Sequence, residues 1–210
     1  MEKKAREHYD NLDGLRAISC LCIVAYHIKK YSSFDLNGFG ATVVDSWTHF
    51  VPLFLLISGF GIFCGYYDSF KTRTIDLCVF YKKRYRKILP FFAFVMLIDV
   101  VVERSLTHLI EALTEATLVF GLLPNVAMEV CGVGWTLGVI FLFYMLFPFI
   151  VFLCHSKKSA LVAFFASVLL SLLCSAYFFT DKFVINFTPR HNFLYCAPFF
   201  LGGGGNLSLL

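Results

Sequence analysis

Two ionisable residues, Arg16 and His27, lie at opposite ends of a short apolar stretch and are the leading candidates for chemistry. On an α-helix their eleven-residue separation comes within ~20° of three whole turns, so both would share one face about 16 Å apart. A histidine kept neutral inside a helix bundle can act as a general base toward a hydroxyl group, and an arginine at the helix end suits a phosphate group. The alternative is that Arg16 only anchors the helix end and that His27 is an interior histidine with satisfied hydrogen bonds.

The composition of the chain indicates that these residues belong to a membrane protein. Of the 210 residues, 59% are hydrophobic and 15% are charged, whereas soluble domains are ~45–50% apolar and ~25% charged. The mean hydropathy is +0.74. Because no long polar stretch is present, residues 1–210 are expected to form a single membrane-embedded domain. The net charge of +4 is clustered in the connections, which suits membrane topology and does not indicate a nucleic-acid surface.

The apolar runs predict an all-α fold, a polytopic transmembrane helix bundle with about six spans. A spanning helix needs ~20 mostly apolar residues. The expected spans cover residues 13–32, 47–67, 88–103, 132–154, 158–179 and 191–210. Between the third and fourth spans, residues 104–116 carry apolar side chains at helical spacing, with Glu111 and Glu115 off this stripe. That pattern predicts an amphipathic helix at the membrane interface.

The distribution of Lys and Arg predicts the orientation of the bundle. Thirteen of the 18 fall on one side, in the N-terminal segment, the loop 68–87 and the turn at Lys157 and Lys158. Cytoplasmic connections carry an excess of these residues. We therefore expect a multi-pass protein of the cell membrane with its N-terminus and the loop 68–87 in the cytoplasm.

Four runs of sequence resemble motifs of the acyltransferase-3 family of membrane acyltransferases, and they occur in the same order. They are NLDGLRAI at 11–18 followed by His27, VPLFLLISGF at 51–60, YKKRYRKILP at 81–90, and WTLGVIFLFYMLFP at 135–148. The resemblance implies transfer of an acyl group, commonly acetyl from acetyl-CoA, to a hydroxyl of a surface glycan or a similar acceptor. It also implies that the chain is the N-terminal part of a longer domain, truncated after about six spans.

The resemblance assigns roles to particular residues. The essential Arg-x10-His pair of the family maps onto Arg16 and His27. A basic segment that would bind the CoA donor maps onto Arg84 and Lys87, where Arg is usual at both positions. Lys87 keeps the charge but loses the bidentate fork of arginine. A topology anchor is an equal alternative for this segment. Ile140 stands where many members have Glu, so any role of that carboxylate is absent or is taken over by another acid.

Several further residues are open to more than one interpretation. Asp13 lies three residues before Arg16 and could pair with it on the helix surface, be an ordinary acidic residue at the helix N-terminus, or line a cavity. Ser58 and the neighbouring glycine could permit close helix packing or line the same cavity. Asp99, inside the third span, is a third candidate for the cavity lining. Trp135 and Tyr144 are expected to be interface or core aromatics.

Two other functions compete with an enzyme that uses acyl-CoA as its donor substrate. A multi-pass transporter or flippase would also carry interior Arg, His and Asp residues, although the inverted repeat typical of many transporters is not evident. An inactive fragment of the acyltransferase is the second alternative, suggested by the ending that follows the run Gly202 to Gly205. No metal site and no bound cofactor are expected. The expected partners are the lipid bilayer, acyl-CoA and a hydroxyl acceptor, whose identity the sequence does not define.

Overall fold

The computed structural model describes residues 10–32, 36–118, 134–178 and 191–205, and every regular element in these ranges is helical. In chain order the elements are α1 (Asp10–Tyr31), α2 (Phe39–Ser46), the short 3-10 helix η1 (Trp47–His49), α3 (Phe50–Lys71), α4 (Leu77–Glu103), α5 (Leu106–Ala116), α6 (Trp135–Leu153), α7 (Lys157–Leu173), the π-helical turn η3 (Cys174–Phe178) and α8 (Phe193–Gly205). The expected all-α fold is therefore confirmed over the described residues.

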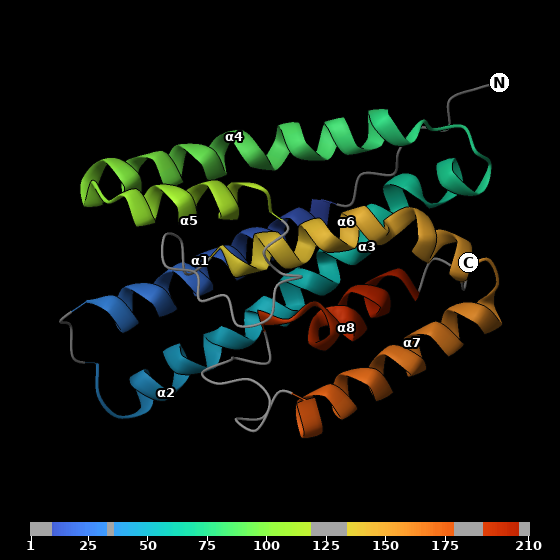
Figure 1. The fold of residues 1–210 in the computed structure, drawn as a ribbon. Coiled ribbons are helices and arrows are strands. Elements are labelled where there is room, and N and C mark those ends of the chain that lie inside the picture. Colours follow the sequence, from blue (N-terminus) through green and yellow to red (C-terminus); the bar gives the residue numbers. More distant parts are fainter. Residues whose placement is uncertain (1–9, 33–35, 119–133, 179–190, 206–210) are drawn as a thin grey trace.

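The long helices run roughly along one direction, and their connections gather at two ends (Figure 1). The α3–α4 and α6–α7 connections lie at one end, and α1 begins near the middle of the molecule and runs away from that end. The α1–α2 and α4–α5 connections lie at the opposite end. Lys71, Arg73, Lys157 and Lys158 lie in or next to the first set of connections. The expected loop 68–87 is mostly helical, because α3 continues to Lys71 and α4 begins at Leu77, so its other basic residues lie in the first turns of α4.

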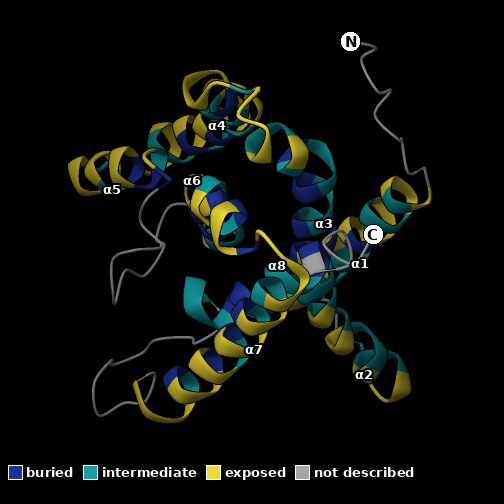
Figure 2. Cartoon of the chain, turned by 90° about the vertical axis from the view of Figure 1, so that its right-hand side faces the viewer, coloured by how far each residue is buried: buried dark blue, intermediate teal, exposed yellow. Residues whose placement is uncertain are grey.

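Helix α3 is the centre of the fold and packs against α1, α6 and α8 (Figure 2). The largest buried cluster joins side chains from α3, α4, α6 and α8 and is rich in phenylalanine. Within it the rings of Phe143 and Phe200 stack at 4.1 Å between centroids, and Phe80 meets Tyr66 edge to face at 5.1 Å. This aromatic core fixes α3, α4, α6 and α8 relative to one another.

Glycines let α3 and α8 approach closely. A side-chain carbon added at Gly59 would collide with the carbonyl oxygen of Phe200, and one at Gly203 would collide with the carbonyl oxygen of Leu56. In both cases the obstacle is backbone, so it cannot move aside cheaply. The glycine run 202–205 is helical. It provides a surface for close helix packing, as small residues do in membrane proteins.

Helices α4 and α5 form a second unit. Asp76 caps α4, because its side chain accepts a hydrogen bond from the Cys78 backbone N–H. Phe92 and Met96 of α4 pack with Phe141 of α6. The predicted amphipathic helix is α5, but its apolar stripe is exposed while Glu115 is buried. The reason is that the opposite face, around Ala112, packs against α4 and α6.

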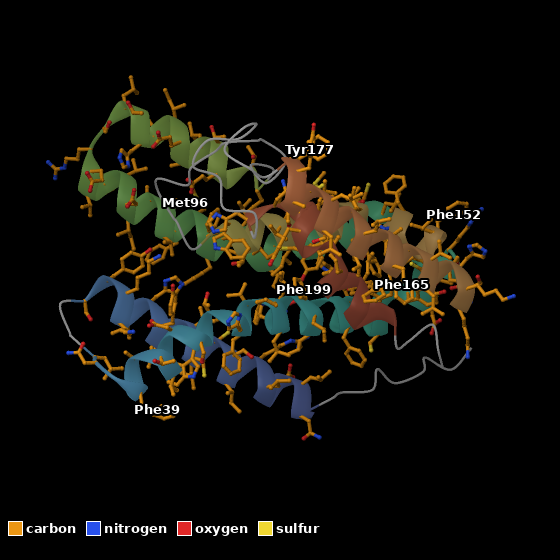
Figure 3. The ribbon with its side chains drawn as sticks, turned by 90° about the horizontal axis from the view of Figure 1, so that it is seen from below. Phe39, Met96, Phe152, Phe165, Tyr177 and Phe199 are labelled. Carbon is orange, nitrogen blue, oxygen red and sulfur yellow. The ribbon has the colours of Figure 1, made fainter. Side chains whose placement is uncertain are left out.

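Three helical segments are long and apolar enough to cross a membrane: Phe39–Lys71, Trp135–Leu153 and Lys157–Phe178. They correspond to the second, fourth and fifth expected spans. Side chains such as Phe152 and Phe165 are exposed on them and are suited to lipid (Figure 3).

The other three expected spans are not both long and apolar enough to meet the same criterion. The total of about six spans therefore stays a prediction. The first and third are helices that carry charged residues, and the sixth lies in the shorter apolar helix Phe193–Gly204. Parts of the fourth, fifth and sixth expected spans fall outside the described residues.

Candidate functional site

The position of Arg16 is set by α1 and α3 together. Its Nη1 donates to Asp13 Oδ1 at 2.7 Å, and its Nη2 donates to the carbonyl oxygen of Ile57 on α3 at 3.3 Å. The first contact is a partly exposed ion pair one helical turn apart, worth about 0–1 kcal/mol. The second turns the guanidinium toward the interior of the fold. The pairing of Asp13 with Arg16, one of its sequence interpretations, is thus present.

Arg84 lies among aromatic rings. Its guanidinium carbon is 4.5 Å from the centroid of Tyr66, 5.0 Å from that of Tyr144 and 5.5 Å from that of Phe80. A guanidinium at these distances from ring faces gains cation–π attraction. The Nε atom of Arg84 is buried and has no hydrogen-bond partner within the described residues. The side chain is therefore held in place by rings while part of its donor capacity is left for another group.

Both arginines contact neighbouring turns of α3. Arg16 Nη2 lies against Gly61 of α3, and the Arg84 guanidinium lies over Tyr66, five residues further along the same helix, and over Tyr144 of α6. These residues come from α4, α1, α6 and α3. The structure thus brings together Arg16 and Arg84, which the sequence analysis selected separately and which are 68 positions apart.

His27 lies further along α1, away from the arginines. Because α1 is continuous from Asp10 to Tyr31, eleven residues place His27 on the same side of the helix as Arg16, about 16 Å along the axis. Its ring is half-buried, stacks with Tyr31 at 5.8 Å and meets Tyr26 edge to face at 5.1 Å. Close by, Lys29 donates to Asp45 at 2.7 Å and ties this end of α1 to α2.

The remaining sequence candidates lie apart from the arginine pair or at its edge. Lys87 is exposed one turn beyond Arg84, and Ser58 is half-buried beside the α3–α8 crossing. Asp99 pairs with His108 of α5, Oδ2 to Nδ1 at 3.4 Å, and is about 22 Å along α4 from Arg84. Ile140 is buried in the main core, so a hydrophobic side chain fills the position of the family carboxylate.

Sequence reasoning missed three residues of this arrangement. They are Tyr66 and Tyr144, which contact Arg84, and Gly61, which lies against Arg16. Tyr144 is expected from the sequence to be an interface or core aromatic. Two tyrosines within apolar spans are a weak signal because buried tyrosines usually seek a polar partner. Nothing local marks Gly61.

The arrangement has the chemistry of an anion site at one level of the bundle and an imidazole at another. Comparison with known proteins agrees with the sequence motifs, since a family model described as an acyltransferase domain matches residues 9–207. No curated protein and no solved structure matches the chain.

Proposed function

Since this chain belongs to the acyltransferase-3 family, a family of membrane acyltransferases, we propose that it transfers an acyl group from acyl-CoA to a hydroxyl group. We further propose that the acyl group is acetyl and that the acceptor is a cell-surface glycan or a similar alcohol. The observation that carries the proposal is that Arg16 and Arg84 contact neighbouring turns of α3, at Gly61 and Tyr66, with His27 about 16 Å from Arg16 along the same side of α1.

The distance between the arginines and His27 favours a long donor. A donor anchored by its phosphates at Arg16 and Arg84 must carry its reactive carbonyl to the level of His27. The pantetheine arm of CoA is an extended, flexible chain that separates phosphates from thioester in this way. In an acyl phosphate the phosphate is bonded directly to the acyl group, so such a donor could not serve both places at once.

In the proposed reaction His27 is the general base. Its neutral imidazole takes the proton of the acceptor hydroxyl as the oxygen attacks the thioester carbonyl. A carbon–oxygen bond forms, the carbon–sulfur bond breaks, and the CoA thiolate leaves and takes up a proton. Arg16 and Arg84 hold the donor through its phosphates, and Lys87 adds an exposed positive charge near them.

The proposed topology places the donor site toward the cytoplasm. CoA is a cytoplasmic metabolite, and we place the basic end of the bundle, with the N-terminus and residues 68–87, in the cytoplasm of a multi-pass membrane protein. The donor then enters from the cytoplasmic end, and the acceptor meets the acyl group near His27 toward the opposite end.

The test measures acetyl-CoA cleavage in membranes that contain the full chain, as release of free CoA thiol. The parent should cleave acetyl-CoA and leave acetyl phosphate intact. Because loss of a general base typically costs ~10²–10⁴-fold in rate, His27→Gln should nearly abolish cleavage while inserting at normal levels. His155→Gln, which alters an exposed histidine in the α6–α7 turn, is the matched control and should keep the parent rate. Activity of His27→Gln within a few-fold of the parent would remove His27 from the proposal.

A further inference from the structure

The absence of a side chain at Gly61 determines where Arg16 lies. A side-chain carbon at Gly61 would sit 2.5 Å from Arg16 Nη2, the same nitrogen that donates to the Ile57 carbonyl oxygen one turn earlier on α3. The obstructing atom is the end of a flexible side chain. Any side chain at position 61 would therefore displace the guanidinium of Arg16 and leave the packing of α3 intact.

Tyr144 approaches the arginine pair from α6. Its ring lies against the guanidinium of Arg84, with 5.0 Å from guanidinium carbon to ring centroid. The same guanidinium lies over Tyr66 of α3 at 4.5 Å, five residues beyond Gly61, so Tyr144 borders the turns of α3 that Arg16 contacts. The ring and the hydroxyl have separable effects: the ring restricts Arg84, and the hydroxyl adds a polar group.

Two guanidinium groups on neighbouring turns of one helix repel each other unless an anion lies between them. Within the described part of the chain, Arg16 forms a partly exposed ion pair with Asp13, and the buried Nε of Arg84 has no hydrogen-bond partner. Guanidinium donors in this arrangement match the oxygens of a phosphate group, with which arginine forms strong, directional hydrogen bonds.

We propose that Gly61 and Tyr144 are positioning residues that gather Arg16 and Arg84 into one anion-binding site between α1, α3, α4 and α6. The ligand class is a phosphate or pyrophosphate group. That this group belongs to the acyl-CoA donor rests on the proposed function, whereas the anion site itself does not.

The first experiment compares Gly61→Ala with Gly65→Ala in the purified full chain in lipid nanodiscs. Gly65 lies one turn further along α3, and a side-chain carbon there meets nothing within 4 Å. Both changes raise helix propensity equally. Gly61→Ala should displace Arg16 and so remove a hydrogen bond to a charged group, which is a strong interaction. The affinity for radiolabelled CoA should fall about tenfold or more, and inorganic pyrophosphate should compete about tenfold more weakly or worse. Gly65→Ala should bind within about twofold of the parent.

The second experiment separates the two parts of Tyr144. Phe at this position keeps the ring against Arg84 and removes the hydroxyl, which should weaken pyrophosphate binding about three- to tenfold. Leu removes the ring as well, and the lost cation–π attraction should add a further fall of about tenfold. Thermal unfolding of each variant in the same nanodiscs shows whether the bundle is intact, and a purely structural role would lower the unfolding temperature without changing pyrophosphate affinity.

The possible results test the anion site and the identity of the donor independently. Equal binding by Gly61→Ala and Gly65→Ala, in protein that inserts normally, overturns the role of Gly61. If Gly61→Ala does not insert, unchanged affinity in Tyr144→Phe and Tyr144→Leu overturns the site. A parent chain that binds neither CoA nor pyrophosphate also overturns it. Binding of pyrophosphate with the expected Gly61 dependence, but without acetyl-CoA cleavage, supports the anion site and contradicts the proposed function.

Discussion

At the scale of single residues, Arg84 shows how a side chain gains a role from its surroundings. Stacked against Tyr66 and Tyr144, it loses conformational freedom before any ligand arrives. A binding group that is already ordered spends less entropy when it captures its ligand. A lysine in this place would keep the charge but could not stack its planar group or offer the same fork of donors.

Changing Arg84 to Lys should therefore weaken donor use without removing charge. We expect the KM for acetyl-CoA to rise about 10- to 100-fold, the value of one or two charge-assisted hydrogen bonds, with a smaller change in kcat. Steady-state kinetics in membranes measure both constants. Arg86→Lys, an exposed position two residues along the same helix, serves as the control. An unchanged KM in Arg84→Lys would leave the basic segment with a topology role alone.

At the scale of elements, the contact between α3 and α8 depends on glycine in both helices. Gly59 and Gly203 bring backbone against backbone, so neither helix offers a flexible atom that could yield to a larger residue. The helix-breaking tendency of the glycine run is outweighed because these glycines gain close van der Waals packing along the crossing.

Gly203→Ala should consequently separate two helices of the core. A carbon at this position collides with the Leu56 carbonyl oxygen, and we expect a loss of about 3 kcal/mol or more, at the upper end of overpacking costs. Gly65→Ala adds the same methyl group where nothing lies within 4 Å and should leave stability unchanged or slightly raised. Thermal unfolding in detergent compares them. Equal unfolding temperatures would contradict the close crossing.

At the scale of the whole molecule, the ends of the bundle differ in charge. The first turns of α4 and α7, which are rich in Lys and Arg, lie at one end, and α1 runs from Arg16 to His27 away from that end (Figure 1). A donor site and a base at different depths would allow a charged donor and an external acceptor to approach from opposite sides of a membrane.

Single cysteines in a variant whose eight native cysteines are replaced by alanine test this topology. A membrane-impermeant maleimide added outside intact cells should label Asn37→Cys, in the α1–α2 connection. It should label Arg73→Cys and Lys158→Cys only after the membrane is permeabilised, because the positive-inside rule places these connections in the cytoplasm. Labelling at Arg73→Cys from outside would reverse the proposed orientation.

The sequence by itself determined the protein class, the helical segments and the two ends of the candidate site. Composition and apolar runs indicated a membrane protein, and helical periodicity put Arg16 and His27 on one side of α1. These properties are local, since they depend on residue type and on spacing within one helix. The motifs carry the family resemblance in the same way, because each lies in a continuous run.

Only the tertiary structure decided which helix faces meet. It brought Arg16 of α1 and Arg84 of α4 to neighbouring turns of α3, where Gly61 contacts Arg16 and Tyr144 contacts Arg84. It also turned Glu115 inward while the apolar stripe of α5 faces out. The physical reason is that in a membrane protein both the lipid-facing and the packed faces of a helix are apolar. Periodicity therefore does not distinguish the inner face from the outer one, and contacts between helices far apart in sequence follow from shape and close packing alone.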